Sequence, residues 1–389
     1  MATHFSRRNF LGIGGLSTLS IGSGLTPATG SLARQARSTT AATNTIRMFG
    51  DGLGLTPGEV ASIWTDLATR DAIKVDSYSN GGSVERLETA FAEILGKERA
   101  VFMPTGTLAN HLAVRALADG KGRTVVQAES HLYNDSGDCV QTLSNIPLVP
   151  LGTGRASFTL TELEKAVDRA NNGRVKTAVR VISIETPVRR RFGEIFNASE
   201  LEQIVGFAKQ NSIRLHLDGA RIFLQAAYEQ RQLADYAAPF DTVYVSLYKY
   251  FNAPSGAILA GPRSLLDTMF QTRRMFGAGL PAAWPFAALA HHYLPGFLDR
   301  YRSAIEVSKQ WLARIERHDA FRVEHIPNGT NLFHLRVTGN ATRLRQRLRE
   351  NGVVLGTLLS GNRFLISVNE TWNLRSADEL ENLFAVSIS

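Results

Sequence analysis

Cysteine is nearly absent from this sequence of 389 residues, in which Cys139 is the single cysteine. One thiol excludes a disulfide within the chain and a zinc site built on cysteines, and we predict no metal site. Long apolar runs are also missing. After residue 40, no stretch approaches the roughly 18 apolar residues that a membrane-spanning helix requires. We therefore expect no membrane span in the body of the chain.

Aspartate and glutamate are absent from the first forty residues. Arg7-Arg8, with the glycine- and serine-rich apolar stretch that follows over 13–25, is typical of a twin-arginine export signal, and Ser31-Leu-Ala33 fits its cleavage site. We predict such a leader over residues 1–37 and a periplasmic or otherwise exported protein. The alternatives are a disordered basic tail and a cytoplasmic location. Because this pathway moves folded proteins, a cofactor can be acquired before export.

Basic residues outnumber acidic ones, and the formal charge is +8 at pH 7. Net charge alone indicates nonspecific attraction to anions and carries no information about a specific partner. The chain has no helix-turn-helix, zinc-finger or RNA-binding pattern. We interpret the clusters Arg189–Arg191 and Arg343–Arg349 as a loop and a solvated helix face. We therefore predict no nucleic-acid partner.

Strand and helix patterns alternate from about residue 84 onward. Apolar residues recur at helical spacing over 84–95, and that helix is expected to end at Gly96. Short apolar strands and further helices follow, which predicts an α/β fold with a mainly parallel sheet covered by helices on both faces. The strands expected in this part are 99–104, 124–127, 180–185, the strand that ends on Asp218, the strand that ends on Lys249, and 257–261.

The pattern changes after Pro281, where a mostly helical stretch over about 283–318 leads into a second α/β pattern. We therefore predict a large domain over 48–285 and a smaller C-terminal domain over 286–389. In the smaller domain we expect strands near 331–337, 353–356 and 363–368, and helices near 341–351 and 376–386.

Lys249 ends a strand of β-branched and aromatic residues that begins at Thr242. A lysine amine can form a Schiff base with an aldehyde cofactor, of which pyridoxal phosphate is the commonest. Asp218 ends the preceding apolar strand, and a carboxylate there can keep a pyridine nitrogen protonated. The two residues together predict a pyridoxal-phosphate site.

Two earlier segments offer groups that suit the same ligand. Pro104-Thr-Gly-Thr107 follows a strand and begins a helix, so Gly106 and Thr107 can present backbone N–H groups and a hydroxyl to a phosphate. The alternative is an ordinary capped helix. His131 lies in a loop after the next strand, where it can stack on an aromatic ring, act as a base, or be a plain polar loop residue. All four elements follow strands, at the sheet edge where open α/β sheets bind ligands.

The order of these motifs along the chain, and the residues within them, resemble those of the threonine aldolase/β-eliminating lyase family of fold-type I pyridoxal-phosphate enzymes. The resemblance covers roughly residues 48–370. Its matching segments are Val84–Lys97, Pro104-Thr-Gly-Thr107, His131-Leu-Tyr133, His216-Leu-Asp-Gly-Ala-Arg221, Ser246-Leu-Tyr-Lys249 and Asn252-Ala-Pro-Ser-Gly256.

The resemblance implies a mainly parallel seven-stranded sheet in the large domain and a small α/β domain at the C-terminus. It implies that Lys249 binds pyridoxal phosphate covalently and later moves protons, and that Asp218 pairs with the pyridine nitrogen. It also implies that Gly106 and Thr107 hold the phosphate. His131 is expected to stack on the ring and is the candidate base for a substrate β-hydroxyl.

The resemblance further implies two substrate-binding arginines and an oligomer. Arg221 is expected beside the phenolic oxygen of the cofactor and the substrate. Arg363 matches the small-domain arginine that grips the substrate α-carboxylate, with a surface arginine as the alternative. Family members are dimers or tetramers, so we expect a homodimer or homotetramer in which the loop around Tyr78 contributes to the partner's site.

The chain departs from the family pattern on the substrate side of the cofactor. The expected activity is cleavage of L-threonine or a related β-hydroxy amino acid to glycine and an aldehyde. The alternatives are a β-eliminating lyase, racemase or aminotransferase acting on another amino acid, or an exported cofactor-binding protein without turnover. One altered segment is Met48-Phe-Gly-Asp-Gly52, which stands in place of a serine-containing motif. The other altered positions are Glu185-Thr-Pro-Val-Arg-Arg190, Gly277-Ala-Gly-Leu-Pro281 and Tyr248.

Overall fold

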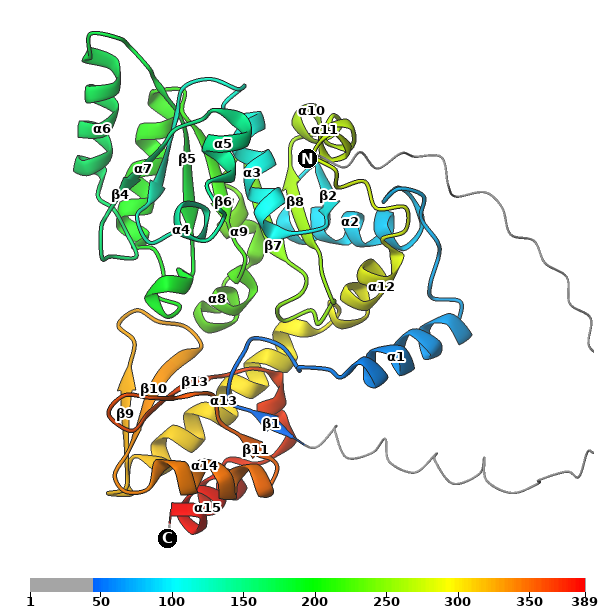
Figure 1. The fold of residues 1–389 in the computed structure, drawn as a ribbon, viewed down its shortest axis with the longest axis vertical. Helices are drawn as coiled ribbons and strands as arrows, with labels where there is room; N and C mark the ends of the chain where they lie inside the picture. The colour runs from blue at the N-terminus through cyan, green and yellow to red at the C-terminus, as the bar shows by residue number, and fades with distance from the viewer. Residues whose placement is uncertain (1–44, 389) are drawn as a thin grey trace, which may run out of the picture. The chain divides into compact units, whose positions relative to one another are not determined.

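Three β-sheets organise residues 45–388, which are the residues that the structure, a computed structural model, describes (Figure 1). The strands are β1 (Ile46–Arg47), β2 (Arg99–Met103), β3 (Arg123–Gln127), β4 (Leu148–Leu151), β5 (Val179–Glu185), β6 (Arg214–Asp218), β7 (Thr242–Ser246), β8 (Ala257–Gly261), β9 (Phe321–His325), β10 (Leu332–Val337), β11 (Val353–Val354), β12 (Leu358–Leu359) and β13 (Arg363–Ser367). The α-helices are α1 (Pro57–Thr69), α2 (Gly82–Leu95), α3 (Gly106–Leu117), α4 (His131–Asn134), α5 (Cys139–Ser144), α6 (Leu160–Asn172), α7 (Ala198–Gln210), α8 (Ile222–Glu229), α9 (Leu233–Ala237), α10 (Arg263–Leu266), α11 (Met269–Met275), α12 (Trp284–Tyr293), α13 (Phe297–Ile315), α14 (Ala341–Glu350) and α15 (Ala377–Ile388). Two 3₁₀ turns, η1 (Arg189–Arg191) and η2 (Glu370–Leu374), complete the set.

The largest sheet has seven strands in the order β2-β8-β7-β6-β5-β3-β4. Every neighbouring pair is parallel except the two pairs that β8 makes, with β2 and with β7. A parallel return needs a crossover of about a dozen residues or more, and only the segment 247–256 joins β7 to β8, so β8 runs antiparallel. The predicted α/β fold with a mainly parallel seven-stranded sheet is confirmed.

Helices cover both faces of this sheet. Successive strand residues point to opposite sides, and here apolar residues point to both. Phe102 of β2 packs into the core cluster that contains Phe91 of α2, whereas its neighbour Val101 packs with Leu112 of α3 on the other face. Helices α7 and α8 contribute to the first cluster, and α3 contributes to the second. The three-layer arrangement fits the strand–helix alternation of the sequence.

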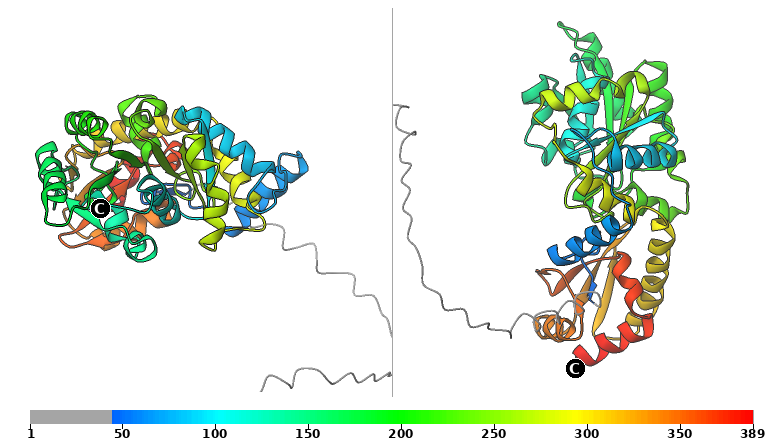
Figure 2. Two further views of the ribbon diagram at one scale, coloured as in Figure 1. Left: turned by 90° about the horizontal axis from the view of Figure 1, so that it is seen from above. Right: turned by 90° about the vertical axis from the view of Figure 1, so that its right-hand side faces the viewer.

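The C-terminal residues form a four-stranded antiparallel sheet, in the order β12-β13-β10-β9, together with α13, α14 and α15 (Figure 2). Trp311 of α13 makes edge contacts with Trp372 and Phe384, at ring-centroid distances of 5.5 Å and 5.0 Å. Strand β1 joins this part of the fold, because Ile46 pairs in parallel with Val353 of β11. The limits chosen for the two domains, 48–285 and 286–389, stay predictions.

No helix within residues 45–388 is long and apolar enough to cross a lipid bilayer. The leader predicted over residues 1–37 lies outside the described residues.

Candidate active site

A cavity of about 800 Å³ opens where β5, β6 and β7 end. Four of the residues predicted to act together line it: Lys249, Asp218, His131 and Arg221. Asp218 is the last residue of β6, and Lys249 lies three positions beyond the end of β7. The carboxyl ends of neighbouring parallel strands meet at one edge of a sheet, and this is why residues distant in sequence face one cavity.

A chain of buried hydrogen bonds fixes the carboxylate of Asp218. Asn110 of α3 donates from Nδ2 to Asp218 Oδ2 at 2.6 Å, and the backbone N–H of Ala220 donates to Oδ1 at 3.2 Å. The Oδ1 of Asn110 lies 2.9 Å from Nε2 of His216, whose Nδ1 lies 2.8 Å from Thr242 Oγ1. Burial lowers the pKa of His216 to about 4, so its ring is neutral at physiological pH. A neutral ring that donates from Nε2 accepts at Nδ1, and this tautomer orients the amide of Asn110 with its donor toward Asp218.

Lys249 lies half-buried on the cavity wall between two tyrosine rings. Its Nζ is 4.9 Å from the ring centroid of Tyr248 and 6.0 Å from that of Tyr244. Burial, and then the nearby charge of Arg221, lower the pKa of the Lys249 amine from 10.5 to about 8. The uncharged fraction of the amine near neutral pH is therefore far larger than that of an ordinary lysine, and the uncharged form is the one that reacts with an aldehyde.

His131 is the first residue of α4, which Ser130 caps. Its backbone N–H donates to Oε2 of Glu185 at 2.6 Å, and the backbone N–H of Arg189 donates to Oε1 of the same carboxylate at 2.8 Å. Glu185 is buried beside Asp218, and burial and the neighbouring carboxylate raise its pKa. Glu185 thus joins the end of β5 to the loop that presents His131.

The turn predicted to bind phosphate begins α3 as expected, with the Thr105 side chain accepting from the N–H of Leu108 at 3.2 Å. Gly106 and the half-buried Thr107 form its first turn, where free N–H groups attract anions. A Cβ at Gly106 would lie 1.9 Å from the Tyr244 hydroxyl, so glycine is required there. Neither Gly106 nor Thr107 lines the cavity, but Tyr244, which packs against Gly106, does.

Substitution of Gly106 by alanine is expected to lower the free energy of unfolding by about 1–3 kcal/mol and to weaken cofactor binding, because Tyr244 is buried and cannot move aside. Thermal unfolding and equilibrium cofactor titration measure both effects. Gly206 in α7 is a matched control, since a Cβ there meets no heavy atom within 4 Å. An alanine at Gly106 as well tolerated as one at Gly206 would contradict this packing argument.

Arg221 contacts Asp51, which sequence analysis did not select. Its Nε and Nη2 both lie 2.9 Å from Asp51 Oδ2, and both side chains are largely buried. Asp51 belongs to the segment 48–52, one of the departures from the family pattern, but nothing in that segment of the sequence indicates its pairing with Arg221. The pair joins the N-terminal segment to the helix that follows β6.

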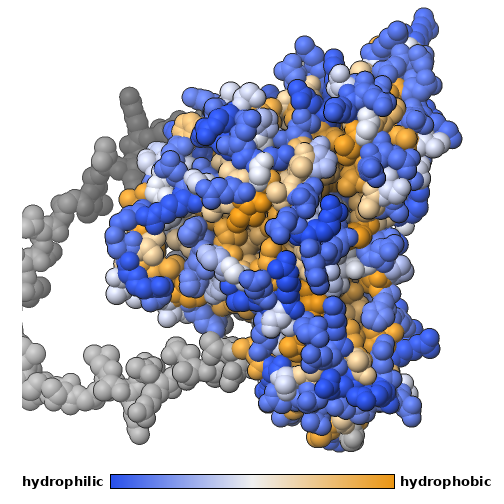
Figure 3. All heavy atoms as spheres, turned by 180° about the vertical axis from the view of Figure 1, so that it is seen from behind, coloured by the Kyte–Doolittle hydropathy of each residue, from blue (hydrophilic) through white to orange (hydrophobic). Residues whose placement is uncertain are grey.

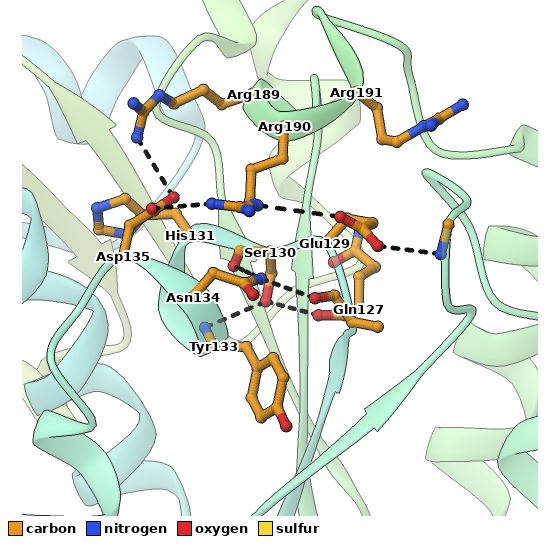
Figure 4. Close-up of polar contacts among 12 residues, drawn as sticks. Gln127, Glu129, Ser130, His131, Tyr133, Asn134, Asp135, Arg189, Arg190 and Arg191 are labelled. Atoms are coloured by element: carbon orange, nitrogen blue, oxygen red, sulfur yellow. Dashed lines mark hydrogen bonds and ion pairs between the residues drawn. The ribbon is translucent and has the colours of Figure 1, made fainter.

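Of the arginine cluster 189–191, Arg189 lines the cavity. Figure 4 shows Arg189 and Arg190 directed toward Asp135. Arg189 and Arg190 both reach Asp135, at 3.3 Å and 3.2 Å, and Arg190 also approaches Glu129 at 3.9 Å. The loop predicted here is a single 3₁₀ turn whose charges are paired within the protein.

Arg363 is not brought to this cavity. It begins β13, its Nη1 lies 3.5 Å from Oε2 of Glu324, and its Nε donates to the carbonyl of Ser360 at 3.2 Å. Its predicted role in binding a carboxylate stays a prediction. Among the lining residues that sequence analysis did not select is another arginine, Arg47.

The residues of this cavity, together with the α3 turn that packs against Tyr244, fit pyridoxal phosphate. An amine of lowered pKa, a buried carboxylate that lines the cavity, and a glycine at a helix N-terminus are the groups that its aldehyde, its ring nitrogen and its phosphate require. No group of three or more potential metal ligands occurs within residues 45–388.

Comparisons with known proteins agree with this chemistry. The beta-eliminating lyase family model matches residues 67–338. The low-specificity L-threonine aldolase 1 of Arabidopsis thaliana is 25% identical over 281 residues, 70% of this chain and 78% of that protein. Alanine racemase TOXG of Cochliobolus carbonum is 28% identical over 244 residues, 62% of this chain and 61% of that protein.

A solved structure extends the similarity to the fold. An inferred aromatic amino acid beta-eliminating lyase/threonine aldolase from Exiguobacterium sp. 255-15 is 28% identical, with a TM-score of 0.74 over 89% of this chain and 97% of that one. The chain therefore belongs to the beta-eliminating lyase family, as its motifs predict, and it is a pyridoxal-phosphate-dependent lyase.

Proposed function

We propose that this enzyme cleaves the Cα–Cβ bond of L-threonine or a related β-hydroxy amino acid, releasing glycine and an aldehyde. The convergence of Lys249, Asp218 and His131 on one cavity carries the proposal, because this set supplies a covalent anchor, a ring-nitrogen partner and a base. The similarity to a threonine aldolase supports the same reaction.

Each residue has a distinct task in this proposal. Bound pyridoxal phosphate supplies an electron sink for the bond that breaks. Asp218, held by Asn110, keeps positive charge on the ring nitrogen. His131 takes the proton from the β-hydroxyl as the Cα–Cβ bond breaks, and the uncharged amine of Lys249 holds and returns protons at Cα.

The decisive experiment is a product screen. Purified protein saturated with pyridoxal phosphate is incubated with L-threonine, L-allo-threonine and phenylserine, and the glycine and aldehyde released are measured. Aldol cleavage is expected to release the two products in equal amounts. The larger phenylserine is included because Leu55, Val60 and Trp64 form an apolar wall of the cavity. Absence of glycine from all three substrates would refute aldol cleavage.

A racemase is the second candidate, because one relative is named an alanine racemase and the departures from the family pattern fall on the substrate side. Chiral chromatography of alanine distinguishes it from the aldolase. Pyruvate and ammonia would instead indicate β-elimination, and a keto acid with transfer of the amino group would indicate an aminotransferase. A yellow protein that forms no product from any amino acid would indicate a binding protein without turnover.

The pKa of Lys249 predicts how the apoprotein takes up its cofactor. Only the uncharged amine attacks an aldehyde, so the rate is expected to rise about tenfold per pH unit below pH 8 and to level off above about 8. An unperturbed lysine would level off near its ordinary pKa of 10.5. Stopped-flow absorbance from pH 6 to 10.5 measures the profile. A midpoint near 10 would show that the cavity does not lower the pKa.

The proposed assembly is a homodimer or homotetramer in which the Tyr78 loop reaches the partner's site. Val75, Tyr78 and Met275 are exposed large hydrophobic residues, and Tyr78 is joined to the α11–α12 connection by a 3.0 Å backbone bond to Pro281. Figure 3 shows hydrophobic residues scattered among hydrophilic ones over the middle of one face. Light scattering of the wild type and the Tyr78→Ala variant tests the proposal. A wild-type protein that is a monomer would refute it.

Export through the twin-arginine pathway is proposed for the leader 1–37, on the basis of Arg7-Arg8 and the absence of acidic residues. Replacing both arginines with lysine is expected to leave the protein in the cytoplasm. Fractionation of cells that express the two forms measures this. Equal distribution of both forms would favour the cytoplasmic alternative.

A further inference from the structure

The basic side chains of the cavity differ in whether an acid already neutralises them. Four of them, Lys249, Arg221, Arg189 and Arg47, line its wall. Lys249 is the proposed cofactor anchor, Arg221 is bound to Asp51, and Arg189 is paired with Asp135. Arg47 has no ion pair or side-chain hydrogen bond to any residue within 45–388.

Arg47 is nevertheless held in place. Its guanidinium carbon lies 4.5 Å from the ring centroid of Phe49. A Cβ at Gly54 would lie 2.3 Å from the same carbon, so the backbone of Gly54 also packs directly on the guanidinium. An arginine in contact with a ring and with backbone keeps its planar N–H donors in a defined orientation.

The backbone of Arg47 is fixed by the C-terminal part of the fold. Its N–H donates to Oγ1 of Thr371 at 3.0 Å, and its carbonyl accepts from Nδ2 of Asn369 at 2.8 Å. Thr371 and Asn369 are both buried. Arg47 also pairs with Val354 across the β1–β11 ladder. The side chain therefore extends from a rigid base into the cavity.

Arg363, the arginine that the family pattern suggests, does not line the cavity. Ser367, at the opposite end of β13 from Arg363, reaches the cavity wall by donating to the Gly50 carbonyl at 2.8 Å. At about 3.4 Å per residue, Arg363 begins the strand about 14 Å from Ser367. Its guanidinium is paired with Glu324 in addition.

We infer that Arg47 binds the α-carboxylate of the amino acid substrate, the role that the family pattern places at Arg363. A free, preoriented guanidinium binds a carboxylate through two parallel hydrogen bonds. The inference rests on the proposed function only in that the substrate is an amino acid, whichever reaction follows. Arg47 would orient that substrate from the N-terminal segment, on the side where the departures from the family pattern lie.

The test compares glycine with glycinamide, which lacks the negative charge. Binding to the cofactor-loaded enzyme is followed by the change in cofactor absorbance, without any bond cleavage. For Arg47→Gln we expect the dissociation constant for glycine to rise about 10- to 100-fold, and that for glycinamide to change less than about threefold. Arg47→Lys, which keeps the charge but loses the paired donors, is expected to lie between wild type and Arg47→Gln.

Arg363→Gln provides the matched comparison and should bind glycine within about twofold of wild type. A selective loss of glycine binding in Arg363→Gln, or unchanged glycine binding in Arg47→Gln, would overturn the inference. Equal losses for glycine and glycinamide would overturn it too, since they would indicate general damage to the cavity. A wild type that binds glycine but makes none from β-hydroxy amino acids would reject aldol cleavage and leave this result valid.

Discussion

The Lys249→Ala variant is expected to lose covalent attachment of pyridoxal phosphate and to turn over substrate at least about 1000-fold more slowly. The amine of Lys249 lines the cavity and has a pKa of about 8, so it can act both as the covalent anchor and as a proton carrier. Alanine removes both functions. Noncovalent binding of the cofactor should persist, because Asp218 and the α3 turn remain.

Borohydride reduction followed by peptide mass spectrometry measures the attachment, and steady-state kinetics measure the turnover. Lys97 is a matched control, since it is a partly buried lysine outside the cavity whose Nζ donates to the Phe240 carbonyl at 2.6 Å. Small added amines should restore part of the activity of Lys249→Ala by supplying the missing base. Labelling of another lysine, with turnover retained, would show that Lys249 is not the anchor.

The central part of the site could be predicted because it depends on local signals. Asp218 ends an apolar strand as predicted, whereas the strand predicted to end on Lys249 stops at Ser246, three residues earlier. Alternation with helices indicated a parallel sheet. A parallel sheet brings such strand ends to one edge, so their proximity followed without any long-range information. Gly106 could be predicted for a similar reason, because a glycine between a strand and a helix marks a tight turn.

The substrate side could not be predicted in the same way, because it depends on contacts between distant segments. Arg47 reaches the cavity only because β1 pairs with β11, and Asp51 only because it binds Arg221. Neither contact has a periodic signal in the sequence. Arg363 was selected from a short motif, but a motif does not specify which end of a five-residue strand faces the cavity.

In the fold, the direction of the antiparallel strand β8 is the feature that its own sequence does not predict. Its apolar run, Ala257–Gly261, looks like the buried parallel strands beside it. The direction is determined by the short connection after β7, in which Lys249 lies. The lack of a crossover helix thus keeps the lysine in a tight loop at the sheet edge.

Replacing Asp218 with asparagine is expected to lower turnover about 100- to 1000-fold while leaving the fold intact. The effect comes from charge, because a neutral amide cannot keep positive charge on the ring nitrogen. Hydrogen bonding adds to it, since Asn110 and the Ala220 N–H both donate to the carboxylate. An amide at this position must turn its own donor toward one of these donors.

Steady-state kinetics and the pH dependence of the cofactor absorbance report the loss of charge, and thermal unfolding reports the fold. Asp241→Asn is the matched control, because Asp241 accepts from the Leu215 N–H at 2.7 Å at the opposite end of the same strand. His216 stays neutral above about pH 4, so the orientation of Asn110 toward residue 218 should not change from pH 6 to 9. If both variants slow turnover equally, the loss arises from damage to β6, and Asp218 has no special role toward the ring nitrogen.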